Sequence, residues 1–142
     1  MDSTLPSVIS ALGLDARSLS LLVVAAFLAI LFLQSGLDKL LDYTGNLSWL
    51  KEHFSKSLLG GTVPVLLPLL TLFETAAGLF SAFAVVQVLM GAGYAWMWWG
   101  FMLSAASLLM LFFGQRVAKD YAGAAALVPY FLVVIFGLYL LG

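Results

Sequence analysis

In this sequence of 142 residues, Glu74 is the residue whose type and position most clearly indicate a chemical role, because its carboxyl group lies inside a long apolar segment. A charged side chain within a membrane-spanning helix costs at least ~2.5 kcal/mol, so Glu74 is expected to lie beside a cation or to hold a proton. Lys39 and Arg116 are the candidate counter-charges, and Glu74 would then accept a proton or a hydrogen bond. The alternative is a structural role, in which Glu74 is protonated, or paired with Gln34 or a helix carbonyl, and fixes helix packing.

Small and polar side chains at helical spacing predict which helix faces meet around Glu74. The face of Glu74 also carries Thr71, Thr75, Gly78 and Ser81. Two earlier pairs lie one helical turn apart, Gln34 with Asp38 and Ser35 with Lys39, and a later stripe consists of Gly100, Ser104, Ser107, Leu111 and Gln115. Helices in membranes turn such faces toward one another, because small side chains allow close approach and polar ones find partners. We therefore expect a polar pocket near the cytoplasmic ends of the helices, formed by Gln34, Lys39, Glu74, Gln115 and Arg116.

The residue types that are missing exclude several kinds of cofactor. The sequence has no cysteine, which excludes a disulfide relay, a thiolate-held iron–sulfur cluster and a cysteine-based zinc site within the chain. His53 is the only histidine, so one chain cannot hold a haem between two histidines. No metal site and no intrinsic cofactor are expected. His53 itself is either a ligand or a quinone-facing donor, or a solvated side chain without a special task.

A group of tryptophans also allows two interpretations. Trp96, Trp98 and Trp99 lie at the start of an apolar segment. They could stack on the ring of a cofactor, or they could anchor a helix at the membrane–water interface, where amphipathic rings are enriched.

The composition predicts the elements that must position these residues. Hydrophobic residues make up 63% of the chain and charged residues 9%, against roughly 25% charged in soluble domains. The mean hydropathy is +1.11. Such a chain belongs in a lipid bilayer, and its formal charge of −1 offers no basic surface for nucleic acid.

Four apolar segments are long enough to cross a bilayer, which takes about 20 residues of helix. The predicted spans cover residues 19–38, 63–87, 94–113 and 122–141, after a short lead over residues 1–17, and Ser18 is the predicted N-cap of the first span. Within residues 46–57, Leu47, Leu50 and Phe54 recur at helical spacing, which predicts a short amphipathic helix at the interface. The expected fold is an all-α, integral membrane four-helix bundle that forms a single domain over residues 1–142.

The start of the second span is open, because Pro64 and Pro68 both lie near it. Proline is tolerated in the first turn of a helix and is disruptive later. A helix that begins near residue 62 places Glu74 near the midplane of the bilayer. A helix that begins at Pro68 places it about 10 Å from the interface.

The distribution of cations predicts the orientation. Five of the six lysines and arginines lie in the first and third loops, namely Lys39, Lys51, Lys56, Arg116 and Lys119, whereas Arg17 lies on the opposite side. Cytoplasmic loops carry an excess of these residues, so loops 1 and 3 are expected in the cytoplasm and both termini outside.

Two short runs resemble the signatures of DoxX-type membrane proteins. Residues 32–42, FLQSGLDKLLD, resemble the end of the first helix in that family, with its glycine, its lysine and an apolar pair. Residues 73–80, FETAAGLF, resemble the second-helix signature, an acidic residue followed four positions later by glycine. The family often has an arginine early in the first span, whereas Arg17 precedes the span predicted here, and Ala77 stands where a second glycine is often found.

The resemblance implies a four-helix protein of the bacterial cytoplasmic membrane, with Lys39, Glu74 and Gly78 as the family-matching residues. Relatives have been linked to oxidoreductase systems, including a membrane subunit of a thiosulfate:quinone oxidoreductase. The expected function is therefore that of a membrane subunit in a quinone-linked respiratory assembly, without a redox metal centre of its own and with other membrane proteins as partners. Quinone is the one cofactor expected at the polar pocket.

Two other functions remain open. One is a non-catalytic accessory or structural subunit of a larger membrane complex, and the other is a small transporter or proton pathway. Proton relays usually need several ionisable residues within the membrane, and Glu74 is the only charged side chain in the interior of the predicted spans, away from their ends. Whether the chain is itself an enzyme also stays open.

Overall fold

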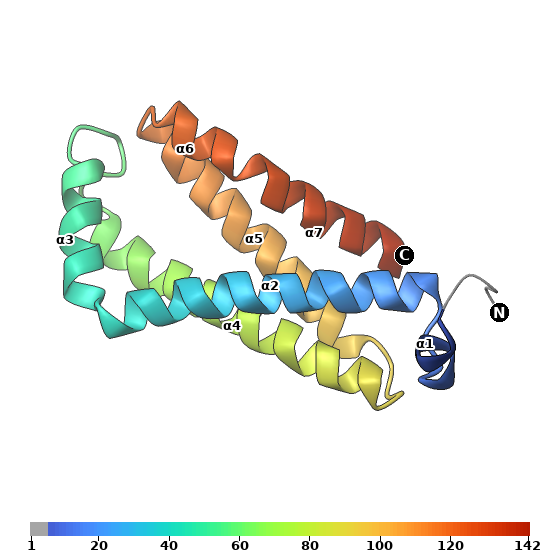
Figure 1. Cartoon of the computed structure of the whole chain (residues 1–142). Helices are drawn as coiled ribbons and strands as arrows, with labels where there is room; N and C mark the ends of the chain where they lie inside the picture. Colours follow the sequence, from blue (N-terminus) through green and yellow to red (C-terminus); the bar gives the residue numbers. More distant parts are fainter. Residues whose placement is uncertain (1–5) are drawn as a thin grey trace.

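The computed structural model describes residues 6–142 and shows a bundle of helices (Figure 1). This part of the chain contains no strand and forms seven helices: α1 Ser7–Ala11, α2 Ala16–Leu41, α3 Tyr43–His53, α4 Val63–Leu89, α5 Ala95–Val117, α6 Tyr121–Ala126 and α7 Val128–Leu141. Helices α2, α4 and α5 and the segment Tyr121–Leu141 are each long and apolar enough to cross a membrane. The expected all-α fold with four membrane-spanning helices is therefore confirmed.

Helix α2 begins earlier than the sequence predicted. Asp15 is its N-cap, and its carboxylate accepts a hydrogen bond of 2.7 Å from the backbone N–H of Ser18. The prediction that Ser18 is the N-cap is wrong, because the carboxylate of Asp15 satisfies one of the free N–H groups of the first turn from one turn earlier. Arg17 consequently lies inside the helix rather than ahead of it. Its guanidinium donates to the carbonyl oxygens of Leu140 at 2.7 Å and Leu141 at 3.3 Å, at the end of α7.

The interfacial helix α3 covers Tyr43–His53 and not the predicted residues 46–57. Asp42 starts it, because its carboxylate accepts a hydrogen bond of 3.3 Å from the N–H of Gly45. Beyond His53 the chain turns, and the hydroxyl groups of Ser55 and Ser57 donate to backbone carbonyls of the last helical residues and the turn. These local hydrogen bonds compete with helix continuation, so the helix ends earlier than its apolar pattern suggested.

Helix α4 resolves the open question about its start. It begins at Val63 with Pro64 in its first turn, and it continues through Pro68 to Leu89. Glu74 therefore lies near the middle of this helix, about 17 Å from its start. The last span is not continuous in the same way. It is divided at Leu127 into α6 and α7, and Pro129 lies in the first turn of α7.

The bundle is held together by close helix pairs, α2 with α4 and α4 with α5. Glycines make this approach possible, because a Cβ at Gly78 would lie 2.7 Å from the backbone nitrogen of Leu33 on α2, and one at Gly100 would lie 2.7 Å from Oγ of Ser81. The predicted inward face of α4 is confirmed, since Thr71, Glu74, Gly78 and Ser81 are all buried. The outer surface is largely leucine, valine and phenylalanine, as is needed for contact with lipid tails.

The two ends of the bundle differ in their elements. Figure 1 shows α3 and α6 at one end, and the C-terminus, α1 and the turn between α4 and α5 at the other. The first and third loops thus lie at the same end, as the count of four spans predicts. Of the predicted lead, residues 1–5 lie outside the described residues.

Candidate functional site

Three polar side chains meet in the interface between α2 and α4. The ammonium nitrogen of Lys39 lies 2.9 Å from Oε2 of Glu74, and the hydroxyl of Ser35 donates to the same oxygen at 2.7 Å. Lys39 also donates to the oxygen of Ser35 at 2.9 Å. We call Ser35, Lys39 and Glu74 the acid–base cluster. Its carboxylate is completely buried, and the lysine side chain is only 14% exposed.

The local geometry of two helices explains why these three groups converge. Ser35 and Lys39 are four residues apart on α2, so they lie one above the other on the face that packs against α4. Gly36 brings the two helices together, because a Cβ there would lie only 2.5 Å from Oγ1 of Thr75. Polar groups separated by many residues in the sequence thereby meet away from water.

One oxygen of the acid–base cluster has no partner. Within residues 6–142, no group donates a hydrogen bond to Oε1 of Glu74, although the atom is buried. Buried acceptors are rarely left unsatisfied, so an unpaired one marks a place where a water, a proton or a ligand hydroxyl can bind. The cluster can therefore accept one more hydrogen bond without losing those it has.

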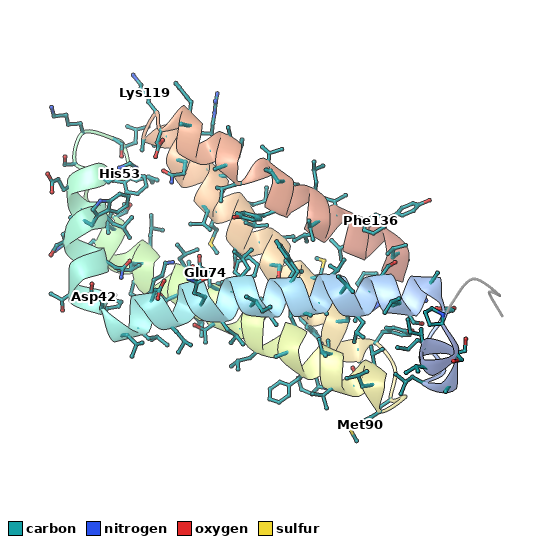
Figure 2. The ribbon with its side chains drawn as sticks, in the orientation of Figure 1. Asp42, His53, Glu74, Met90, Lys119 and Phe136 are labelled. Carbon is teal, nitrogen blue, oxygen red and sulfur yellow. The ribbon has the colours of Figure 1, made fainter. Side chains whose placement is uncertain are left out.

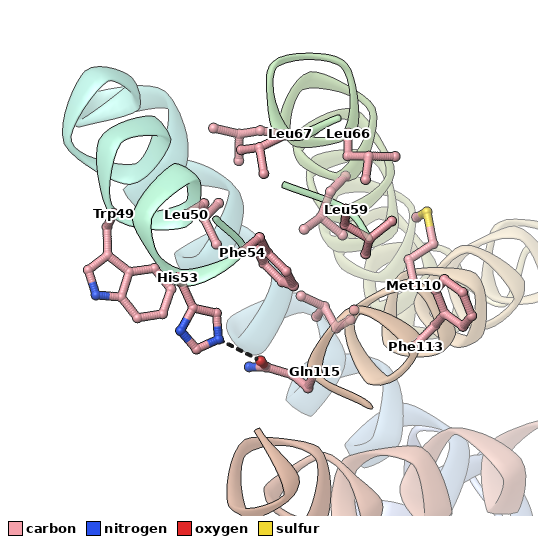
Figure 3. Close-up of a pocket in the computed structure, with 14 residues that line it drawn as sticks. Trp49, Leu50, His53, Phe54, Leu59, Leu66, Leu67, Met110, Phe113 and Gln115 are labelled. Carbon is pink, nitrogen blue, oxygen red and sulfur yellow. Dashed lines mark hydrogen bonds between the residues drawn. The ribbon is translucent and has the colours of Figure 1, made fainter. Parts of the chain in front are cut away.

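A second polar group lies at the end of the bundle that holds α3. Nε2 of His53 lies 3.2 Å from Oε1 of Gln115 (Figure 3). The same nitrogen lies 3.6 Å from Oδ2 of Asp120. The imidazole is stacked on Trp49, with ring centroids 4.7 Å apart, and it meets the ring of Phe54 edge-on at 5.1 Å. These contacts fix the orientation of the imidazole and join α3 to the end of α5.

A cavity of about 200 Å³ opens beside this second group. Its walls are apolar side chains of α3, of the loop after α3, and of α4 and α5, among them Phe54, Leu67 and Met110 (Figure 3). His53 and Gln115 supply its polar side. We call this space the His53–Gln115 cavity. Figure 2 shows that Glu74 lies farther along the bundle than His53 does, so the acid–base cluster and the cavity are separate places.

The structure distributes the five predicted pocket residues over different surroundings. Lys39 and Glu74 meet, whereas Gln115 reaches His53 instead. Gln34 is exposed, because it precedes Ser35 by one residue and therefore points about 100° away from the face that meets α4. Arg116 is also exposed, and its guanidinium lies over the ring of Tyr121 at 4.4 Å, so it is not the counter-charge of Glu74. The prediction of one pocket formed by all five residues is wrong in this respect.

Several residues of these sites were not predicted as site residues. Ser35 was placed on the face of Lys39, and that spacing was the available signal for its contact with Glu74. Asp120 gave no signal, because its approach to His53 depends on the turn between α5 and α6. Phe54 was predicted only as part of the apolar face of the interfacial helix, and Trp49 was not predicted to take part in a site.

The tryptophans of α5 form an aromatic group with α4. The ring of Trp96 lies 5.1 Å from that of Phe80 and 5.9 Å from that of Phe83, and the side chains of Trp96, Trp98 and Trp99 are between 43% and 62% exposed. Exposed amphipathic rings at one end of a spanning helix suit the anchoring interpretation.

Together, the four apolar spans define a multi-pass membrane protein. In comparisons with known proteins, no family model, no curated protein and no solved structure matches the chain. The resemblance to the DoxX family thus rests on the residues of its two sequence runs.

Proposed function

We propose that this chain is a DoxX-like membrane subunit of a quinone-linked oxidoreductase assembly, without a redox metal centre of its own. The observation that carries the proposal is the acid–base cluster. Two of the family-matching residues, Lys39 and Glu74, form a buried ion pair, and the carboxylate keeps one free oxygen. The third, Gly78, packs against α2 and allows the helices to approach.

The chemistry of quinones explains why such a group is useful in a membrane subunit. Reduction of a quinone to a quinol takes up protons as well as electrons, so a site for it needs a group that holds a proton away from bulk water. A buried carboxylate beside an ammonium group can do this, because either group can carry the exchangeable proton. The electrons come from a partner subunit that owns the redox centre.

The location follows from the same reasoning. Because five of the six lysines and arginines lie at the end that holds α3 and α6, we place this end in the cytoplasm and both termini outside. The resemblance favours the bacterial cytoplasmic membrane, with other membrane-protein subunits as partners.

A second candidate function is that of a non-catalytic accessory subunit. It is favoured by the way in which the acid–base cluster joins α2 to α4, since a buried ion pair of this kind can serve to fix helix register alone. In that case the free oxygen of Glu74 holds a structural water.

The proposal is tested by purifying the native protein in a mild detergent, identifying the co-purifying subunits by mass spectrometry and extracting bound quinone. We expect recovery with subunits that carry haem, flavin or iron–sulfur centres. Recovery of the chain alone, without quinone, would contradict the proposal and favour a transporter.

Two substitutions separate the two candidate functions. Glu74→Gln keeps the shape and an acceptor for Ser35 but cannot exchange a proton. In a redox subunit it lowers the turnover of the assembled complex, whereas in an accessory subunit it is mild and only Glu74→Leu disturbs assembly. Unchanged turnover of an assembled Glu74→Gln complex refutes a role of Glu74 in proton transfer.

A further inference from the structure

The geometry points to a second site in this chain: the His53–Gln115 cavity binds a single six-membered ring that carries carbonyl or hydroxyl oxygens and arrives from the lipid. The inference rests on the proposed function only for the redox use of such a ring. Its location differs from the acid–base cluster, around which the sequence predicted a quinone pocket.

The size of the cavity is sufficient for one ring. Its volume is about 200 Å³. An apolar protein cavity of about 150 Å³ accommodates benzene, whereas pockets for drug-sized ligands begin at about 300 Å³. A benzene-sized ring with a few small substituents therefore fits.

The polar groups of the cavity stand at one side only. When Nε2–H of His53 donates to Oε1 of Gln115, the amide NH₂ of Gln115 is left to donate to a ligand oxygen. Oδ2 of Asp120 lies 3.6 Å from the same imidazole nitrogen and adds a further oxygen to this polar side. Trp49 stacks on the other side of His53 and holds it in place. The remaining walls are hydrocarbon, so the ligand needs an apolar body and an oxygen at one edge.

The contrast with a second hollow shows that this combination is particular to the first. A space of about 260 Å³ between α5 and the α6–α7 segment is lined by leucine, valine and phenylalanine alone. Nothing there could orient an oxygen-bearing ligand, and lipid tails suffice to fill it. It provides a natural control.

The rim of the His53–Gln115 cavity indicates the route of entry. Leu66 and Phe113 are 38% and 61% exposed, and both belong to spanning helices whose outer faces meet lipid. On α4 the lining residues lie between Val63 and Leu70, within the first ~10 Å of the helix. An amphipathic ring is most stable at this depth, with its body among acyl chains and its oxygen near water.

Binding is tested on the purified full chain in phosphatidylcholine nanodiscs. The probe is tetramethyl-1,4-benzoquinone, and tetramethylbenzene, which lacks the two oxygens, is the matched control. Because the chain has no cysteine, the quinone cannot add to a thiol. We expect the quinone to raise the midpoint of thermal unfolding saturably and to quench a tryptophan signal that is lost in Trp49→Phe. The hydrocarbon is expected to bind at least about tenfold more weakly, since one hydrogen bond is worth about that factor.

Substitutions in the wall test where the probe binds. A Cβ at Gly114 would stand 3.5 Å from Cζ of Phe54, an ordinary contact, so Gly114→Leu extends into the cavity without opening the backbone. Gly114→Leu is expected to abolish the response to the quinone without lowering the midpoint of unfolding of the ligand-free protein. If the yield of Gly114→Leu is low, Leu111→Phe replaces it as the test variant. Leu109→Phe, in the purely apolar hollow, is the control that leaves binding unchanged.

The polar side and the route of entry have their own tests. Gln115→Met, similar in size, is expected to weaken quinone binding about tenfold and to leave binding of the hydrocarbon unchanged. A benzoquinone with one isoprene unit is expected to bind at least as tightly as the tail-free ring, because the rim opens to lipid. Weaker binding of this compound overturns entry from the membrane and favours a soluble ligand.

Two outcomes overturn the inference. One is equal binding of the quinone and the hydrocarbon, and the other is quinone binding that survives both Gly114→Leu and Leu111→Phe. Neither depends on partner subunits or on Glu74, so the inference and the proposed function can fail separately.

Discussion

Replacement of Lys39 by methionine is expected to destabilise the bundle strongly, because it leaves the carboxylate of Glu74 buried without its counter-charge. The two charged atoms are 2.9 Å apart, and the carboxylate is completely buried. At an effective dielectric constant of about 20, charges at this distance attract each other by about 6 kcal/mol, part of which the cost of desolvation has already cancelled. Removal of one partner from such a pair typically costs about 3–5 kcal/mol. We expect Lys39→Met to lower the free energy of unfolding by about 3 kcal/mol.

The measurement is reversible unfolding of the purified protein in mixed micelles of a mild detergent and dodecyl sulfate, followed by circular dichroism. A cycle with Glu74→Leu isolates the interaction of the pair. The double variant Lys39→Met/Glu74→Leu has no uncompensated charge, so it is expected to be more stable than Lys39→Met alone. Lys51→Met, at an exposed position of α3, is the matched control and is expected to change stability by less than about 0.5 kcal/mol. A coupling energy below about 0.5 kcal/mol between positions 39 and 74 would refute the reasoning.

Three further predictions concern packing and helix ends. Gly78→Ala brings a methyl group within 2.7 Å of the backbone nitrogen of Leu33, so it is expected to cost about 1–3 kcal/mol in the same unfolding assay, whereas Gly61→Ala, in open space, is expected to be neutral. Arg17→Ala removes two hydrogen bonds to the end of α7 and is expected to speed amide hydrogen exchange in the last turn of α7. Unchanged exchange there would show that these hydrogen bonds do not stabilise the end of α7. The hydrogen bond that the carboxylate of Asp15 accepts from the backbone N–H of Ser18 lowers the pKa of this carboxyl below the ordinary 3.8. The contribution of the carboxylate to stability is therefore present above pH 3.8 and is lost as the pH falls through the lower folded-state pKa. Asp15→Asn is expected to remove this part of the acid sensitivity.

The spans of this bundle could be predicted because the length and composition of a membrane helix follow from the thickness of the bilayer. Their ends could not, since local hydrogen bonds decide them. Asp15 and Asp42 each accept a backbone N–H and start a helix earlier than the apolar pattern does. Helix α5 runs on to Val117, although the predicted third span ends at residue 113. Polar residues near a helix end are compatible with both states, so hydropathy alone does not distinguish them.

The acid–base cluster could be predicted in part from helical spacing. Ser35 and Lys39 share a face of α2 at a spacing of four, and the small residues around Glu74 indicated the inward face of α4. The sequence did not predict which face of α2 turns toward α4, because this helix is apolar on most of its circumference. Gln34 and Ser35 were therefore equivalent in the sequence, and only packing against α4 selects Ser35.

The His53–Gln115 cavity depends on a different kind of information. Its polar pair joins residues 62 positions apart through α3, whose placement is set by the turn after His53 and by packing against α4. No periodicity encodes such a placement, which explains why the sequence assigned Gln115 to the neighbourhood of Glu74. The consequence is chemical as well as geometric. A group that can hold a proton lies deep between α2 and α4, whereas the space that fits a ring lies at the membrane boundary beside α3, so proton exchange and ring binding are expected to respond to different substitutions. A Glu74→Gln protein that still binds the quinone, and a Gly114→Leu protein that keeps its ion pair but does not, would establish that separation.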